Sequence, residues 1–374
     1  MREVKGCRGK ACLNGKPPSV RREYRTLSHQ ERERLHRAYQ ILKKTGLYEC
    51  LVGKHTLSPE AHHGPGFQGF HRELTKQLEL ALRKIDPKVN MVYWDSSLDA
   101  HLPIPKHSIL FSHHFLGNAE GYVRTGPFAN WAFARPYTDK QGQKHYRLYR
   151  KTGQAGKLLP FANYEQLFRG KRHYAEISTC FPHDSLEYRH GNMHNFIGGH
   201  MANLNVAGYE PAFFLHHCFV DYLWEKFRQE NQHPYFRQWD YPDTFNPHEC
   251  PNLPSNSNRA AHHALAPMRP FKLRNVDGLS NVYTEELYTY QERPTCLTAC
   301  HHSSFLFCSR RLWECVSKVQ LGGACNGFEG EDVCYHGVCR KGVCQPAKPI
   351  PPSAYYPPIF AHRHPTHFFN PYYY

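Results

Sequence analysis

The sequence predicts a mainly helical domain that is followed by a cysteine-rich extension. Three observations support this fold class. Apolar residues recur at helical spacing in several segments, His190 and His194 stand four residues apart, and eight of the 14 cysteines fall between residues 296 and 344. The apolar content of 40% and the charged content of 21% suit a globular core, and 374 residues suffice for one large domain or two smaller ones.

The pattern of the first predicted helix runs through residues 26–44. Its apolar side chains have the spacing of a single helical face: Leu35, Ala38, Tyr39 and Leu42. Ser28 and Glu31 precede this face with the spacing of a capping box, in which each side chain accepts a hydrogen bond from the backbone of the other residue. We therefore expect the helix to begin at Ser28.

A second predicted helix follows Gly69 and ends at Asp86, because Pro87 disfavours a helical conformation in the residue before it. Its apolar face comprises Leu74, Leu78, Ala81, Leu82 and Ile85. Two more helices are predicted at residues 190–197 and 213–229. The segment between residues 95 and 180 is rich in turns and aromatic residues and has few periodic stretches.

Composition divides the chain into four parts. Residues 1–25 are basic, contain two cysteines and are expected to be loop-like. Residues 26–290 hold the predicted helices, and residues 291–345 hold the cysteine-rich block. Residues 346–374 are rich in Pro, Tyr and His without periodicity, so we expect this tail to be extended or disordered.

The clustered cysteines predict a small disulfide framework, which persists only in an oxidising compartment. They are Cys296, Cys300, Cys308, Cys315, Cys325, Cys334, Cys339 and Cys344. A zinc module is the alternative, but the segment lacks the paired CxxC motifs of such modules. We therefore expect a secreted, extracellular protein. Which cysteines pair with which is not indicated by the sequence.

Several classes of protein are disfavoured by composition. No run of 18 apolar residues is present, so we expect no membrane span. The N-terminus lacks the apolar core of a signal peptide, so we expect that peptide to be missing from this sequence. The net charge of +15 is spread along the chain without a recognisable nucleic-acid module, so we expect no nucleic-acid partner.

The spacing of the histidines is more informative than their number, which is 28. His190 and His194 would share one face of a helix, and His216 and His217 precede Asp221, which lies one turn beyond His217 and is placed to orient its ring or the nearby backbone. A second group lies earlier in the chain: His55, His62, His63 and His71. Imidazole suits copper, zinc and iron, so the metal stays open at this point. Two groups of three would hold two metal ions, and two Cu(I) ions could share the two-electron reduction of O2.

These segments resemble the type 3 copper proteins, which are tyrosinases, catechol oxidases and molluscan haemocyanin domains. The first matching motif is HHGPGFQGFHRE at residues 62–73. The second is HGNMH at residues 190–194, followed by GGHM at 198–201 and EPAFFLHHCFVD at 210–221. The resemblance covers about residues 20–290 and is strongest to invertebrate, mollusc-like members.

The resemblance implies a four-helix bundle that holds two copper ions, with residues 26–290 as the catalytic domain. The implied copper ligands are His55, His62, His71, His190, His194 and His217. His62 is preferred to His63, because eight residues separate His62 from His71, which is the spacing in the family. Phe213 matches an aromatic residue close to the coppers, and His216 a neighbouring residue that packs behind the ligands. Glu187 matches an acid that holds a water.

Gly191 departs from the family pattern, since many tyrosinases have Asn at this position. The loss of that amide should weaken the hydroxylation of monophenols more than the oxidation of diphenols, because only a monophenol needs the extra deprotonation. The implied function is the oxidation of o-diphenols by O2 to o-quinones, with weaker hydroxylation of monophenols such as tyrosine. Small phenols or the tyrosyl and DOPA residues of proteins are the implied substrates.

Two other functions stay open, namely a haemocyanin-like O2 carrier and a structural matrix protein with a degenerate copper site. The role of the C-terminal region is equally open. Residues 291–374 could shield the copper entrance, and residues 291–345 are expected to form a packed accessory domain. The tail could instead serve protein cross-linking in a matrix or adhesive, through exposed tyrosines such as Tyr355 and Tyr372. The physiological phenol and the oligomeric state are not indicated by the sequence.

Overall fold

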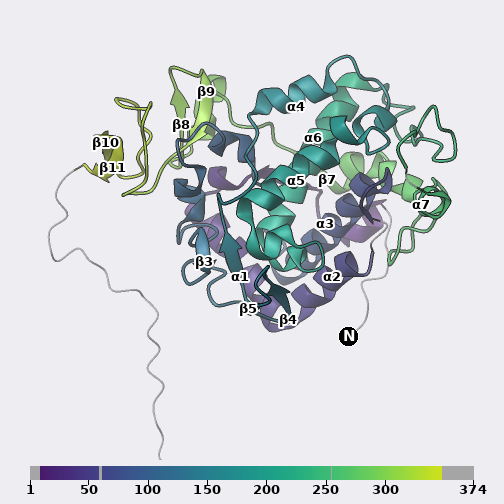
Figure 1. The fold of residues 1–374 in the computed structure, drawn as a ribbon, viewed down its shortest axis with the longest axis horizontal. Helices are drawn as coiled ribbons and strands as arrows, with labels where there is room; N and C mark the ends of the chain where they lie inside the picture. Colours follow the sequence, from purple (N-terminus) through teal and green to yellow (C-terminus); the bar gives the residue numbers. More distant parts are fainter. Residues whose placement is uncertain (1–8, 59–60, 254, 348–374) are drawn as a thin grey trace, which may run out of the picture.

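The computed structural model describes residues 9–58, 61–253 and 255–347 (Figure 1). Its α-helices are α1 (His29–Lys44), α2 (Leu47–Thr56), α3 (Gly66–Ile85), α4 (Phe161–Phe168), α5 (Leu186–Ile197), α6 (Ala212–Asn231) and α7 (Asn256–Ala261). Its strands are β1 (Ser19–Glu23), β2 (Val92–Tyr93), β3 (Glu120–Tyr122), β4 (Ala132–Thr138), β5 (Lys144–Arg147), β6 (Tyr149–Lys151), β7 (Tyr288–Tyr290), β8 (Leu306–Ser309), β9 (Glu314–Ser317), β10 (Gly337–Arg340) and β11 (Val343–Pro346).

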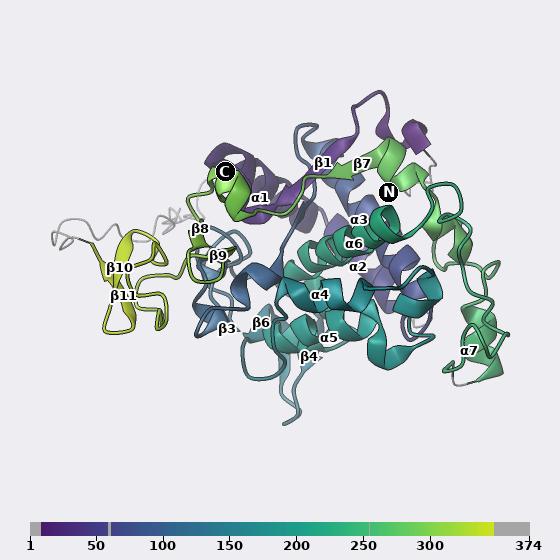
Figure 2. The same ribbon diagram turned by 90° about the horizontal axis from the view of Figure 1, so that it is seen from above.

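Four helices, α2, α3, α5 and α6, form the centre of the molecule (Figures 1 and 2). Helix α3 packs against α1, α2 and α6, and α6 also packs against α5. The main apolar core lies between these helices and includes Leu74, Leu78, Phe214 and Trp224. The prediction of a mainly helical protein with a central bundle is therefore confirmed.

The start of α1 is the capping box that the sequence predicts. The Ser28 side chain accepts a hydrogen bond from the backbone N–H of Glu31 at 3.2 Å, and the Glu31 carboxylate accepts one from the N–H of Ser28 at 2.9 Å. The apolar face that follows, from Leu35 to Leu42, is buried. Local chemistry alone therefore determines where this helix begins.

Helix α3 begins at Gly66, three residues before the predicted boundary at Gly69. Pro65 precedes the first turn, and Gly69 lies inside the helix because of packing rather than flexibility. A Cβ on Gly69 would lie 3.1 Å from the Cα of Gly278, so the two backbones approach too closely for larger residues. Helix α5 likewise begins earlier than predicted, at Leu186 after the Ser185 cap.

The expectation that residues 1–25 are loop-like is wrong from Ser19 onward. Strand β1 lies between β2 and β7 in a three-stranded parallel sheet. Ser19 pairs with Tyr288, and Arg22 pairs with Val92. These pairings join residues far apart in the chain, so no local pattern indicates them. Two small antiparallel sheets, β3–β6 and β4–β5, occupy part of the turn-rich segment.

All eight cysteines of the C-terminal block form disulfides, which excludes the zinc alternative. The pairs are Cys296–Cys308, Cys300–Cys315, Cys325–Cys339 and Cys334–Cys344. The hairpins β8–β9 and β10–β11 lie within this block, at the opposite end of the molecule from α7 (Figures 1 and 2). A further bond joins Cys180 to Cys250, and the free thiols among the described residues are Cys50 and Cys218.

The C-terminal block packs against the helical domain. Arg293 donates to the Asp95 carboxylate at 2.8 Å, and the backbone N–H of Ile109 donates to the carbonyl of Lys318 at 2.8 Å. Within residues 9–58, 61–253 and 255–347, no helix is both long enough and apolar enough to cross a lipid bilayer. The structure describes the chain only as far as residue 347, so the prediction of an extended or disordered tail lies outside the described residues. The domain boundaries at residues 25, 290 and 345 stay predictions.

Candidate metal centre

The first histidine triad comes from α2, the following loop and α3. His55 lies in the last turn of α2, His62 in the loop and His71 in the second turn of α3. One ring nitrogen of each lies within 4.8 Å of those of the other two, and all three side chains are buried. The Nε2 atoms of His55 and His62 are 3.1 Å apart.

The second triad comes from α5 and α6. His190 and His194 lie one turn apart on α5, and His217 lies on α6. Their ring nitrogens also lie within 4.8 Å of one another. His190 and His217 are buried, whereas the His194 residue is partly exposed although its Nε2 atom is buried.

Backbone carbonyls orient three of the six rings. The Nδ1 atoms of His71, His190 and His194 lie 2.8, 2.8 and 2.9 Å from the carbonyl oxygens of Phe67, Glu187 and Met201. Each Nδ1 must therefore carry the proton, which leaves Nε2 as a lone-pair donor.

These three Nε2 atoms are buried and have no hydrogen-bond partner, and both ring nitrogens of His217 are also unpartnered. Buried polar atoms without partners are costly. A metal ion in each triad would take up the three Nε2 atoms and one ring nitrogen of His217. The donor set is purely imidazole, which suits copper, zinc or iron, so the residues present fit a copper pair.

The site keeps its histidines neutral. Burial lowers the pKa of His55 to about 3, that of His62 to about 2 and that of His194 to about 4. Neighbouring histidines add to this effect for His55 and His62, because two adjacent imidazolium ions repel each other. Neutral imidazole is the form that binds metals.

The two triads face each other as one cluster. The rings of His71 and His217 stack with their centroids 4.1 Å apart and an angle of 8° between planes. The Phe213 ring packs 4.2 Å from His217 and 4.9 Å from His55, so it contacts both triads. The ring of Phe213 thus lies beside the proposed ligands, and its role near the metal stays a prediction.

Phe67 also bridges the triads, and sequence reasoning did not assign it a role. Its ring centroid lies 4.5 Å from that of His71 and 4.7 Å from that of His190. Phe67 stands in the GPGF motif, four residues before His71, and this helical spacing is the signal that could have indicated it.

Glu187 and Gly191 lie on α5 on either side of His190. The buried Glu187 carboxylate accepts a hydrogen bond from the backbone N–H of His63 at 2.8 Å, and its Oε2 has no partner. Burial raises the pKa of Glu187 to about 8. A Cβ on Gly191 would meet no atom within 4 Å, so a side chain can be accommodated there.

Asp221 does not bind His217, contrary to the expectation that it could orient this ring. Its carboxylate instead accepts hydrogen bonds from the Arg72 guanidinium at 2.6 Å and from the Tyr288 and Tyr290 hydroxyls at 2.7 and 2.6 Å. Through these bonds the side chain joins α6 to α3 and β7. His216 does lie behind a ligand position, with its Nε2 3.2 Å from the carbonyl oxygen of His190.

His262 is a further buried histidine beside the first triad. Its ring packs against the GPG turn so closely that a Cβ on Gly64 would lie 2.3 Å from a ring atom. Both ring nitrogens lack a hydrogen-bond partner, and burial lowers the pKa of His262 to about 4. The residue lies far along the chain outside any recognised motif, so the sequence carried no signal for it.

The C-terminal block does not contact the triads in the described part of the chain. No hydrogen bond, ion pair or aromatic contact joins residues 296–347 to any of the six histidines. The block contacts residues 95–114 and the start of α1 instead, for example through the Ser303 hydroxyl, which donates to the carbonyl of Arg25 at 2.6 Å.

Known proteins resemble this chain in sequence over most of its length. The model of the common central domain of tyrosinase matches residues 26–230. The tyrosinase-like protein tyr-3 of Caenorhabditis elegans is 37% identical over 92% of this chain and 52% of its own length. A tyrosinase-like protein of Pinctada maxima is 32% identical over 81% of this chain and 68% of its own length. The chain thus spans about half of the nematode protein and about two thirds of the mollusc protein.

Solved structures share the fold at low identity. A polyphenol oxidase from Thermothelomyces thermophila superposes with a TM-score of 0.55 and 20% identity, covering 75% of this chain and 92% of its own. A tyrosinase from Burkholderia thailandensis gives a TM-score of 0.51 at 18% identity, covering 74% of each chain. The matched central domain, the two histidine triads and this shared fold agree: the chain belongs to the tyrosinase family of type 3 copper proteins.

Proposed function

We propose that this protein is a phenol oxidase that binds two copper ions and oxidises o-diphenols to o-quinones with O2. The proposed ligands are His55, His62 and His71 for one ion and His190, His194 and His217 for the other. The observation that carries the proposal is the set of unpartnered ring nitrogens in two facing triads. A bound copper pair would pass electrons from the diphenol to O2.

The reaction balances without any further reactant. Two o-diphenols each lose two electrons and two protons. One O2 takes up the resulting four electrons and four protons and forms two waters. The carbonyls behind His71, His190 and His194 hold the rings in place while this occurs. Phe213 and Phe67 pack against the ligands and exclude water from them. The free Oε2 of Glu187 is placed to hold a water, to which it donates while the carboxyl is protonated, below the raised pKa of about 8, and from which it accepts above that pH.

The proposed function is tested by reconstituting the protein with copper and offering catechol. We expect two copper ions per chain by elemental analysis and catalytic oxidation of catechol in air. Reversible O2 binding without catechol turnover would instead identify an O2 carrier. Failure to retain copper would favour the structural matrix protein.

Gly191 is proposed to set the preference for diphenols over monophenols. We expect Gly191→Asn to raise tyramine hydroxylation by about tenfold or more, because a general-base contribution of this kind is worth about 10²–10⁴-fold. Catechol oxidation should change little, since a diphenol does not need the extra deprotonation. The ratio of the two rates measures the effect.

Gly191→Ala is the matched control for this substitution. It adds a side chain in the same open space but no amide. An equal effect of Ala and Asn, or efficient hydroxylation of tyramine by the unaltered protein, would contradict the role assigned to the missing amide.

We also propose that the protein acts outside the cell and cross-links protein tyrosines in a matrix or adhesive. The disulfide-bonded C-terminal block supports an oxidising compartment. The tail tyrosines, including Tyr355 and Tyr372, lie outside the described residues. We expect deletion of residues 348–374 to leave catechol turnover unchanged and to abolish self-oxidation, which peptide mapping after incubation in air would detect.

The position of this truncation matters. A cut near Arg293 would remove the ion pair with Asp95 and the packing of the whole cysteine-rich block, so lost activity would reflect lost stability. A cut after residue 347 keeps all four disulfides of the block. Tail tyrosines that stay unmodified in the full-length protein would argue against the cross-linking role.

A further inference from the structure

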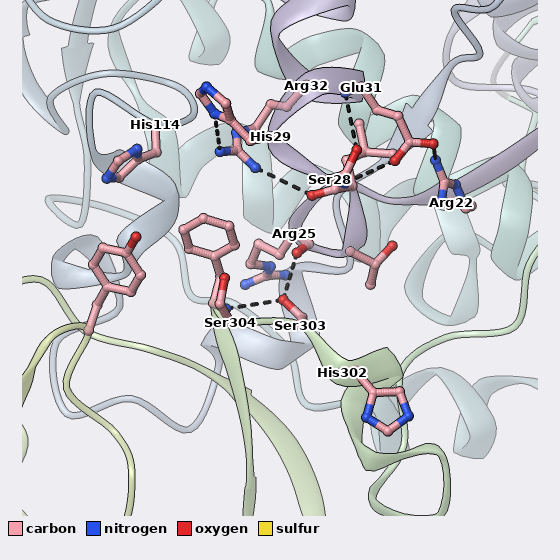
Figure 3. A pocket seen from close by; sticks show the side chains of 14 residues that line it. Arg22, Arg25, Ser28, His29, Glu31, Arg32, His114, His302, Ser303 and Ser304 are labelled. Atoms are coloured by element: carbon pink, nitrogen blue, oxygen red, sulfur yellow. Dashed lines mark hydrogen bonds and ion pairs between the residues drawn. The ribbon is translucent and has the colours of Figure 1, made fainter.

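A pocket of about 630 Å³ lies where the start of α1 meets the C-terminal block (Figure 3). One wall comes from α1 and the segment before it, and includes His29 and Arg32. The opposite wall comes from His114 and from the block, through Ser304, Phe305 and Tyr335. None of the six histidines of the candidate metal centre lines this pocket.

Arg32 is a buried cation without a carboxylate partner among the described residues. Its side chain is 3% exposed, and its Nε has no hydrogen-bond partner. Its other two nitrogens make long contacts of 3.4 Å, to the carbonyl of Leu27 and to the ring of His29.

Four other buried arginines of this protein are each paired with a carboxylate. Arg21, Arg25, Arg72 and Arg150 each lie within 3.0 Å of a carboxylate oxygen. The difference matters because a buried charge is costly unless it is paired and hydrogen-bonded.

The aromatic side chains around Arg32 offset the cost of burying its charge only in part. The guanidinium lies 4.9 Å from the ring centroids of both Phe115 and Phe305, which is the range of a cation–π contact. Burial still lowers the pKa of Arg32, so the charged form lacks full stabilisation. The acid on the rim, Glu31, does not help, because its carboxylate binds Arg22 and the N–H of Ser28.

We propose that this pocket is a binding site for an oxyanion, a carboxylate or a sulfate-like group, which pairs with Arg32. The planar guanidinium is suited to such groups, since it can donate two hydrogen bonds to their oxygens. Figure 3 shows His29, Arg32 and His114 around one side of the pocket and Ser303 and Ser304 below, so further donors surround the same space.

The ligand carries an apolar or aromatic body as well as the anionic group. The pocket is far larger than a bare ion, for which the volume of one water, about 30 Å³, is a fair measure. Its inner wall is aromatic, since Phe305 and Tyr335 stack with centroids 5.2 Å apart and His114 packs on Tyr335 at 5.5 Å. A bound anion would contact both α1 and the C-terminal block, and would therefore hold the block against the helical domain.

The test is the thermal unfolding of the full-length, copper-loaded protein titrated with sulfate or with acetate, at constant ionic strength set by chloride. A ligand that binds only the folded state raises the unfolding temperature in a saturable way. We expect such a rise of several degrees, and the anion that acts at lower concentration identifies the preferred head group.

Arg32→Met keeps an unbranched, apolar stem and removes the guanidinium with its charge. We expect this variant to lose affinity by about tenfold or more, which corresponds to about 1.4 kcal/mol, and to unfold without anion at a temperature no lower than the unaltered protein. Arg124→Gln, which removes a cation from a different surface pocket, is the matched control and should keep the full response.

A second variant keeps the proposal testable if Arg32→Met does not fold. His29 is exposed and contacts Arg32, so His29→Ala should fold and bind the anion several times more weakly. An unaltered protein that shows no saturable response, or an Arg32→Met variant that responds as strongly as the unaltered protein, would overturn the site.

Discussion

His217→Ala is expected to abolish both copper retention and catechol oxidation. His217 is the one residue of the second triad on α6, and its ring also stacks on His71 of the first triad at 4.1 Å. Removal of this ring therefore takes one ligand from the second triad and leaves His71 of the first triad without its stacking partner. Loss of a residue that only supports a ligand typically costs about 10–100-fold in metal affinity, so loss of the ligand itself should exceed about 100-fold.

Stability separates this effect from misfolding. Both ring nitrogens of His217 lack partners, so the metal-free variant loses the packing of the ring but no hydrogen bond, and comparing its unfolding temperature with that of the metal-free parent measures this loss separately. Elemental analysis after reconstitution measures the copper. His233→Ala, at an exposed histidine just beyond α6, is the control and should keep two ions per chain. A His217→Ala protein that retains two copper ions would contradict the ligand assignment.

Asp221→Ala is expected to destabilise the fold by about 3–5 kcal/mol, because it removes one of the two carboxylates that each of the buried Arg21 and Arg72 binds and so leaves their charges only partly compensated. The Asp221 carboxylate binds Arg72 at 2.6 Å and Arg21 at 3.3 Å, and all three side chains are buried. Tyr288 and Tyr290 also donate to it, so one carboxylate joins α3, α6 and the parallel sheet. Urea unfolding of the metal-free protein would measure the change.

The ion pairs of Asp221 also predict a dependence on pH. Burial raises the pKa of Asp221, but Arg72 and Arg21 more than offset this and leave the pKa below its usual value. The stabilisation is therefore fully present above about pH 4, the usual range of an aspartate, and is lost as the pH falls through the lowered value.

Asp332→Ala is the matched control for Asp221→Ala. Asp332 pairs with Lys318, but its side chain is 72% exposed, so its loss should cost about 1 kcal/mol or less. Equal unfolding free energies for the two variants would contradict the role assigned to the buried network.

Much of the candidate site was predictable because its information is local. His190 and His194 share a helical face at a spacing of four residues, and the GPGF segment places His71 at a fixed distance from His62. The capping box of α1 uses side chains three residues apart. The clustered cysteines indicated disulfides, but not which pairs form, because several pairings are compatible with one spacing.

The sequence by itself determined which residue types could bind metal, where α1 begins and that the C-terminal block is cross-linked. Only the tertiary structure decided the parallel pairing of β1 with β7, the partners of Asp221, the packing of His262 on the GPG turn and the isolation of Arg32 in its pocket. The physical reason is range. Helical spacing and capping depend on neighbours within a turn, whereas these contacts join residues that become neighbours only when the whole chain packs, and burial then sets the charge that each must balance.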